Sequence, residues 1–234
     1  MCTVTWQRED GAYQLYCNRD ERKTRSVATR PQPNCSPSKI KYLAPQDPDH
    51  GGTWLAANEF GLTICVLNAN GNNSKANLSR GLLPQALIDA SNADEAIRQL
   101  RELHLDRFLP FTLAALDLHN PTRIAHWDGA LLTTRCDNSR LGLLTSSSLG
   151  DATATQRRAK TFADFDTHSL AQFHRSHGDG DLRFSPCMHR EDAETVSFST
   201  IRCNSVELGF YYSPGAPCLG AKGQTWTLPS RCKS

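Results

Sequence analysis

The order of strand-like and helix-like segments constrains the fold of this chain more than any other feature of its sequence. Segments rich in β-branched and aromatic residues lie at both ends and in the middle, and two helical zones, at about 82–105 and 153–176, separate them. Strands joined by short turns build antiparallel sheets, and a sheet needs another layer to bury its apolar face. The order therefore predicts an α+β domain with sheets in the middle and helices outside.

Two hairpins are predicted in the first third of the chain. Asp10 and Gly11 separate two β-rich runs within 3–17, and an Asp-Gly pair is typical of a tight hairpin turn. A second pair of apolar runs, within 53–67, flanks a short segment with turn-forming residues. The segment 24–48 lies between the hairpins, is rich in Pro, Ser, Asn and Lys and has no periodicity, so we expect a long loop.

The first helical zone carries a start signal. Ser91 or Asn92 fits as the N-cap, and the next turn holds acidic residues. Asp94 and Arg98 have the i,i+4 spacing of a surface ion pair. The apolar face consists of Ala93, Ile97, Leu100 and either Leu103 or His104. Further strands are expected at about 111–118, 122–126, 129–136, 141–147, 195–203 and 206–212.

The charge balance argues against a polyanionic partner. The 234 residues include 26 basic and 24 acidic side chains, a formal net charge of +2, whereas nucleic-acid-binding domains carry a clear basic excess. A chain of this length buries roughly 70 % of the surface that its unfolded form exposes, so one core suffices. We therefore expect a single domain over residues 1–234 that binds no nucleic acid.

No segment is long and apolar enough to predict a transmembrane helix. The best candidate, 108–116, contains Pro110, and a spanning helix needs about 20 apolar residues. Arg8, Glu9 and Asp10 lie where a secretory signal carries its apolar run. We expect a cytoplasmic protein without a transmembrane segment, whose mature form begins at Met1 or one residue later.

The cysteines point to a reducing compartment. The chain has nine of them, and an odd number without a secretory signal favours free thiols, most of them in the core. No two form a C-x-x-C pair, so a zinc site is not expected. The segment with His168, His174, His177 and His189 has the pattern of a helix end followed by a turn, and we interpret these histidines as solvated, with no metal bound.

Cys2 has the clearest chemical potential. If an aminopeptidase removes Met1, Cys2 carries a thiol and a free α-amine. The pKa of an α-amine lies near ~8 and that of a thiol near ~8.5, so the amine can act as general base for the thiol of the same residue. In the next predicted strand, Arg19 could lower the pKa of the thiol and Asp20 could hold the amine. The alternative is that Cys2 is an ordinary second residue and that 18–21 is a solvated strand end.

Several motifs in a fixed order resemble one known family. They are Met1-Cys2-Thr3, Asn18-Arg19-Asp20-Glu21, the Tyr-Leu-Ala-Pro-Gln-Asp segment at 42–47 and the Gly-Gly-Thr-Trp-Leu-Ala-Ala-Asn-Glu-Phe-Gly segment at 51–61. In this order they look like the NRDE family, also called the transport and Golgi organisation protein 2 family. The resemblance is strong from Cys2 to about Asn68 and weaker beyond, where it rests on element order and on residues 188–200.

That family is similar to the N-terminal nucleophile hydrolases of the penicillin V acylase and bile salt hydrolase type. The resemblance implies a four-layer αββα sandwich, two stacked antiparallel sheets flanked by helices. It also implies Cys2 as the nucleophile, Arg19 and Asp20 as its electrostatic partners, Asn68 as an oxyanion donor and Arg190 as a second nearby arginine. The acylases separate their Arg and Asp by two residues, whereas here the two are adjacent.

The resemblance implies hydrolysis of a non-peptide C–N bond in a small-molecule acyl amide, a reaction that needs no cofactor. The chain departs from the acylases at 144–149, where hydroxyls such as those of Ser146 and Ser147 stand in place of a second oxyanion Asn. Losing one oxyanion donor costs about 2.7–4 kcal/mol of transition-state stabilisation, which counts against amidase activity.

The family also implies an alternative without catalysis. In it, the same fold binds and transports haem, an acyl lipid or an acyl-CoA. No C-x-x-C-H motif for haem attachment occurs in the sequence. The conceivable haem ligands are Cys17, Cys65, His126 and Met188, and their spacing singles out none of them. The sequence leaves the oligomeric state open.

Overall fold

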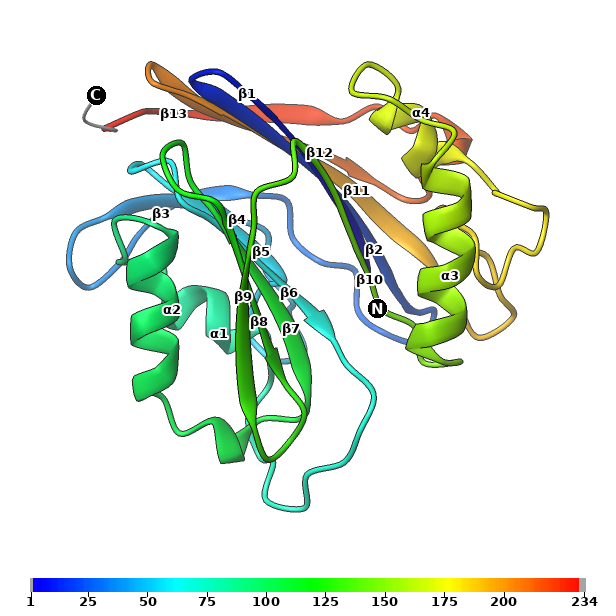
Figure 1. The fold of residues 1–234 in the computed structure, drawn as a ribbon, viewed down its shortest axis with the longest axis horizontal. Helices are drawn as coiled ribbons and strands as arrows, with labels where there is room; N and C mark the ends of the chain where they lie inside the picture. The colour runs from blue at the N-terminus through cyan, green and yellow to red at the C-terminus, as the bar shows by residue number, and fades with distance from the viewer. Residues whose placement is uncertain (1, 232–234) are drawn as a thin grey trace.

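Two stacked antiparallel sheets form the centre of the structure, a computed structural model that describes residues 2–231 (Figure 1). The first sheet has the strand order β10-β1-β2-β11-β12-β13 and the second has the order β3-β4-β5-β6-β7-β8-β9. The first comprises β1 (Cys2–Glu9), β2 (Ala12–Arg22), β10 (Leu141–Thr145), β11 (Ala193–Asn204), β12 (Glu207–Pro214) and β13 (Gln224–Pro229). The second comprises β3 (Gln32–Cys35), β4 (Lys41–Ala44), β5 (Leu55–Asn58), β6 (Thr63–Asn68), β7 (Phe111–Leu116), β8 (Thr122–Trp127) and β9 (Leu132–Asp137).

Helices cover the outer face of each sheet. The helices α1 (Leu82–Ala86) and α2 (Ala93–Glu102) pack on the second sheet, and α3 (Asp151–Phe162) and α4 (Leu170–Arg175) pack on the first (Figure 1). Two short 3₁₀ helices, η1 (Leu105–Arg107) and η2 (Pro217–Leu219), lie in connections. The four-layer αββα sandwich expected from the sequence is confirmed.

The main core lies between the sheets and extends to residues of α1 and α2, and strand alternation decides which residues of the first sheet enter it. Cys2, Val4 and Trp6 of β1 are buried there, as is Cys17 of β2. Tyr16, the neighbour of Cys17, instead belongs to a smaller apolar cluster on the outer face of the same sheet. Successive side chains of a strand point to opposite faces, so β1 and β2 each present one set of residues to the interior and another to the helices.

The local predictions for the first hairpin and for the cap of α2 are confirmed. β1 pairs with β2, and Gly11 has a φ of 72° at the turn, in the left-handed region that glycine adopts without strain. Asn92 is the N-cap of α2, and its side chain accepts a hydrogen bond from the nitrogen of Glu95 at 2.9 Å. Local sequence therefore determines these boundaries.

The expected loop at 24–48 is wrong, because it contains β3 and β4. All four residues of β3 are exposed, and Pro33 is one of them. An exposed edge strand has no buried face and hence no apolar alternation, and proline is tolerated only at such an edge. β13, an edge strand of the first sheet, was not expected either.

The expected pair between Asp94 and Arg98 is also wrong. Asp94 forms an ion pair with Arg123 of β8, and Arg98 pairs with Glu95 at 3.3 Å. A strand that packs against α2 supplies a nearer partner for Asp94 than the same helix does.

The eight cysteines within residues 2–231 are free thiols, and Cys232 lies outside the described residues. Five of these thiols are buried, as expected of small core residues: Cys2, Cys17, Cys65, Cys187 and Cys203. Within the same residues, no helix has the length and apolar character needed to cross a membrane.

Candidate active site

A cavity of about 770 Å³ opens beside the first residue of β1. Its walls come from β1, β2, β6, the residues that precede α1 and the loop that leads to β11. Cys2, Arg19, Asn68 and Arg190 all line this cavity. The structure thus brings four of the five residues proposed from the sequence around one space, and it places Asp20 behind the wall.

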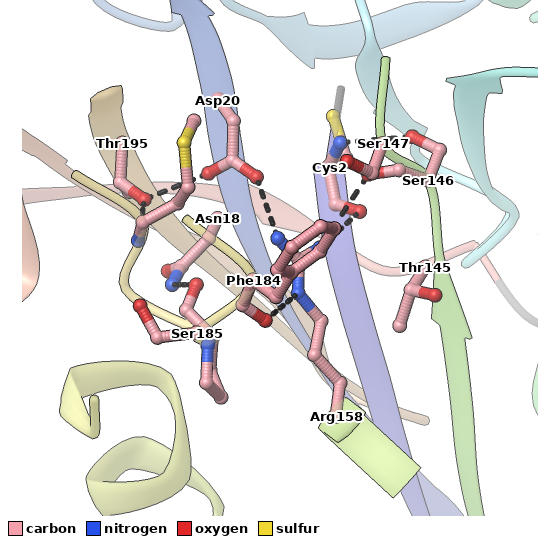
Figure 2. Close-up of polar contacts among 12 residues, drawn as sticks. Cys2, Asn18, Asp20, Thr145, Ser146, Ser147, Arg158, Phe184, Ser185 and Thr195 are labelled. Carbon is pink, nitrogen blue, oxygen red and sulfur yellow. Dashed lines mark hydrogen bonds and ion pairs between the residues drawn. The ribbon is translucent and has the colours of Figure 1, made fainter. Parts of the chain in front are cut away.

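Neighbouring strands hold the main chain of Cys2 on both sides. Cys2 lies opposite Arg19 in the register of β1 and β2. On the other side, Cys2 N donates a hydrogen bond to Ser146 Oγ at 3.0 Å, and Ser146 N donates one to Cys2 O at 3.0 Å (Figure 2). Since the backbone is fixed, rotation about χ1 is the motion that moves the thiol within the cavity.

Arg19 and Asp20 serve different faces of the sheet. Arg19 is directly opposite Cys2, so both side chains point between the sheets. The guanidinium carbon of Arg19 lies 4.2 Å from the ring centroid of Trp54, and its Nη2 is 3.3 Å from Glu21 and 3.8 Å from Asp47. Asp20, one residue later, faces the helix layer. The alternation therefore separates two residues that the sequence analysis placed together beside the thiol.

The thiol of Cys2 is protonated near neutral pH. Its pKa is raised well above the ordinary value, mainly by a hydrogen bond to Cys17 and secondarily by burial. Cys17 also contacts the thiol of Cys65 on β6, so the three thiols form a row that leads from the cavity into the core. The thiolate is the nucleophilic form, so catalysis by Cys2 requires a base within reach of the sulfur.

Arg158 of α3 anchors the floor of the site from the helix side, and sequence reasoning did not find it. Its side chain is buried, and its Nη2 lies 3.3 Å from Asp20 Oδ2. It also donates hydrogen bonds to Phe184 O at 3.1 Å and to Cys2 O at 3.4 Å (Figure 2). Asp20 accepts a further hydrogen bond from Thr195 Oγ1 at 2.7 Å. This network ties α3, β1, β2 and β11 together directly behind Cys2.

The wall opposite Arg19 carries amide and hydroxyl groups. Asn68 is the last residue of β6 and is half-buried at the cavity. Asn70 Nδ2 donates a hydrogen bond to Ser147 O at 3.1 Å, which joins this wall to the segment after β10. Ser147 and Ser148 also line the cavity. The segment expected to replace an oxyanion Asn by hydroxyls therefore does border the site.

Arg190 reaches the cavity from the loop before β11. Its Nε and Nη2 donate to the carboxylate of Asp192 at 2.9 and 2.8 Å, and its Nη1 donates to Ser148 Oγ at 3.2 Å. Only 7 % of its side chain is exposed. Arg190 is therefore a fixed part of the wall and not an exposed loop residue.

Positive charge predominates around the cavity. The lining includes five arginines and three carboxylates, namely Arg19, Arg22, Arg25, Arg80 and Arg190 against Glu21, Asp47 and Asp192. A cleft lined mainly by one sign of charge attracts ligands of the opposite sign. The lining therefore favours a ligand with an anionic group.

The expectation that the histidines are solvated is wrong for His174. This residue of α4 is fully buried, and its Nε2 lies 2.9 Å from Thr5 Oγ1. Burial, aided by the nearby charge of Arg158, lowers its pKa to about 3. His177 is exposed and lies against His189, with ring centroids 5.2 Å apart.

The four conceivable haem ligands occupy three separate environments. Cys17 and Cys65 belong to the core between the sheets, and Met188 is buried in the loop before β11. His126 is exposed on β8, where its Nδ1 lies 3.0 Å from Thr112 Oγ1. Iron ligation by either core cysteine would require the sandwich to open.

A comparison with protein-family models resolves the family. The model described as Transport and Golgi organisation 2 matches residues 1–173. The chain belongs to this family. A comparison of the chain with curated protein sequences gives no match.

Solved structures similar to this member of the Transport and Golgi organisation 2 family are N-terminal nucleophile hydrolases. A penicillin V acylase from Agrobacterium tumefaciens has a TM-score of 0.58 at 11% identity, over 98% of this chain and 86% of that one. The C2A mutant of a conjugated bile acid hydrolase from Clostridium perfringens has a TM-score of 0.57 at 13% identity, over 100% and 99%. An ortholog of N-acylethanolamine-hydrolyzing acid amidase from Caenorhabditis elegans has a TM-score of 0.63 at 10% identity, over 86% and 92%. At these identities the likeness shows the fold.

Proposed function

We propose that this protein is a cysteine amidohydrolase that, once Met1 is removed, hydrolyses a C–N bond in a small acyl amide with an anionic group. The position of Cys2 carries the proposal, because its thiol lines a cavity of about 770 Å³ and its nitrogen is fixed by Ser146 at 3.0 Å. The names of the structural neighbours, an acylase, a conjugated bile acid hydrolase and an acid amidase, support the same reaction class.

In this reaction Cys2 supplies both nucleophile and base. Its α-amine accepts the thiol proton while Sγ attacks the amide carbonyl, and the oxyanion that forms accepts a hydrogen bond from Asn68. The C–N bond then breaks, and the α-amine returns the proton to the leaving nitrogen. Water hydrolyses the thioester and releases the acid. The raised pKa of the Cys2 thiol makes the neighbouring amine necessary.

The first test is the state of residue 2 and its effect on turnover. Intact-mass measurement of the native protein should show loss of Met1, and retention of Met1 would leave the nitrogen acylated and defeat the proposal. Acyl amides with carboxylate, sulfonate or phosphate groups are then incubated with the wild type, with Cys2→Ala and with Cys35→Ala, an exposed cysteine outside the cavity lining. Turnover should survive in Cys35→Ala and disappear in Cys2→Ala. Equal turnover in all three proteins would contradict the assignment.

A second candidate function is the carriage of an anionic ligand without hydrolysis. The surplus of arginine in the cavity lining and the protonated thiol of Cys2 favour it. The propionates of haem and the phosphates of acyl-CoA both match such a lining. Haem and acyl-CoA are titrated separately while tryptophan fluorescence is followed, since Trp54 lines the cavity beside Arg19. Saturable quenching that Arg19→Ala weakens would support carriage, and the absence of saturable binding would count against it.

A further inference from the structure

Four metal-ligating side chains meet at a place remote from Cys2 in sequence and not part of the cavity lining. His177 follows α4, Cys187 and His189 lie in the loop before β11, and Cys218 lies in η2. One ligand atom from each residue lies within 4.8 Å of the ligand atoms of the other three. His189 Nε2 is 3.6 Å from Cys187 Sγ and 3.3 Å from Cys218 Sγ.

The two separations that involve His189 match the edges of a zinc tetrahedron. With Zn–S distances of about 2.3 Å and Zn–N distances of about 2.0–2.1 Å, tetrahedral geometry places neighbouring ligand atoms roughly 3.3–3.8 Å apart. The distances from His189 to both sulfurs fall in this range. Two thiolates and two imidazoles are also the ligand set of a common class of structural zinc site.

Hydrogen bonding alone accounts poorly for this arrangement. A neutral imidazole nitrogen has either one hydrogen to donate or one lone pair to offer, yet two sulfurs approach the same Nε2 of His189. A cation between the three atoms would satisfy all of them together. The ring of His177 packs edge-on against that of His189 and can supply the fourth ligand from the exposed side.

The four ligands lie in segments that are held together by little regular secondary structure. Cys187 N donates to Ser176 O at 3.1 Å and His189 N donates to Leu182 O at 3.0 Å, but the loop between α4 and β11 contains no strand or helix. A metal would tie this loop to the end of α4 and to η2. It would also fix the neighbour of His189, Arg190, which lines the cavity.

We propose that His177, Cys187, His189 and Cys218 form a structural zinc site. Binding deprotonates the two thiols, so two Zn–S and two Zn–N bonds form and two protons pass to solvent. The family model matches residues 1–173, and all four ligands lie beyond that range. The proposed zinc site thus lies outside the matched range, and binding of zinc there does not depend on the proposed hydrolysis.

The test uses the full-length protein, reduced, stripped with a chelator and kept without oxygen. Zn²⁺ is titrated against a chromogenic zinc indicator, and Co²⁺ is added in parallel because tetrahedral thiolate-bound cobalt gives intense visible and charge-transfer bands. Cys218→Ser and His177→Ala change partly or fully exposed ligands, and Cys35→Ser changes an exposed cysteine elsewhere. The wild type and Cys35→Ser should bind one Zn²⁺ per chain and give the tetrahedral cobalt spectrum.

Each ligand variant should bind Zn²⁺ at least about 10–100-fold more weakly than the wild type, because the loss of an outer-shell partner alone costs that much affinity. Equal affinity in the wild type and Cys218→Ser would overturn the proposal, as would an octahedral cobalt spectrum. Recovery of a Cys187–Cys218 disulfide from protein handled under reductant would overturn it as well, because the thiols would then be a redox pair. Because Cys35→Ser also removes a thiol but no ligand of the proposed site, it separates the loss of a ligand from a general effect of losing a thiol.

Discussion

Replacement of Arg158 by Met should destabilise the fold far more than replacement of its neighbour Arg157. The side chains of Arg158 and Asp20 are 1% and 0% exposed, and their ion pair measures 3.3 Å. Removing one partner of a buried pair leaves the other charge without compensation and costs about 3–5 kcal/mol. Arg158 also donates to Phe184 O and Cys2 O, so we expect a loss of about 4 kcal/mol or more for Arg158→Met.

Arg157→Met is the matched control in the same helix. The side chain of Arg157 is 38% exposed and pairs with Asp179 and Asp181 at 3.4 and 2.8 Å. Exposed pairs contribute about 0.2–1 kcal/mol because water screens them, so Arg157→Met should cost no more than about 1 kcal/mol. Both variants replace an arginine by methionine in the same helix, so the main difference between them is the burial of the side chain.

The assay is urea unfolding followed by tryptophan fluorescence at neutral pH. The free energies of unfolding of the wild type, Arg158→Met, Asp20→Asn and Arg158→Met/Asp20→Asn form a double-mutant cycle, and Arg157→Met is measured alongside as the control. We expect the double variant to be more stable than the sum of its single changes predicts, because it leaves no unpaired charge. If Arg158→Met costs no more than Arg157→Met, the reasoning from burial is refuted. If Arg158→Met alone does not fold, the stability of the double variant still decides the matter.

Three further predictions rest on His174, on the thiol row and on a tight contact of Gly142. Burial lowers the pKa of His174 to about 3, so the folded state excludes a proton that the unfolded state binds below pH ~6.5. The wild type should therefore lose about 2 kcal/mol of stability between pH 7 and pH 5, whereas His174→Phe should not. The hydrogen bond that the Cys2 thiol makes to Cys17 is the largest cause of the raised pKa of Cys2, so Cys17→Ala should lower the pH at which iodoacetamide modifies Cys2, as read by peptide mass. A Cβ added at Gly142 would lie 1.9 Å from Cζ2 of the buried Trp6, so Gly142→Ala should cost about 1–3 kcal/mol in urea unfolding.

Matched variants give each of these measurements its reference. His126→Phe changes an exposed histidine and should keep the wild-type loss of stability on acidification. Cys65→Ala removes a core thiol of the same size as Cys17 without removing the direct partner of Cys2, so it should shift the alkylation profile less. A Cβ at Gly209 meets nothing closer than 3.9 Å, and Gly209→Ala should leave the urea midpoint nearly unchanged. A variant that behaves like its reference would contradict the corresponding prediction.

Features that depend on neighbours in sequence could be predicted, whereas features that depend on distant segments could not. The hairpin of β1 and β2 follows from Asp10 and Gly11, and this hairpin alone places Arg19 opposite Cys2. In contrast, β3 is exposed on all four residues and has no alternation to detect. Asp94 pairs with Arg123 because the packing of α2 on the second sheet brings a closer cation than its own helix provides.

The same distinction applies to the candidate site. Arg158 reaches Asp20 across a separation of 138 residues, and Ser146 reaches Cys2 across 144 residues. No spacing rule identifies such partners in one sequence. The faces of Arg19 and Asp20, however, were available from strand alternation. Applied to this hairpin, the alternation predicts that Arg19 and Asp20 point to opposite faces of the sheet.

The location of β1 has a practical consequence for handling the protein. β1 lies inside the first sheet, between β10 and β2, and its first residue, Cys2, lines the cavity. A peptide fused in front of it, such as an affinity tag, would acylate the nitrogen of Cys2 beside the cavity and so block the amine that the proposed reaction needs. β13 is the outermost strand at the other edge of the same sheet. Purification tags and reporters should therefore be placed at the C-terminus. A lack of activity in an N-terminally tagged preparation would reflect the blocked nitrogen of Cys2 and would not test the proposed reaction.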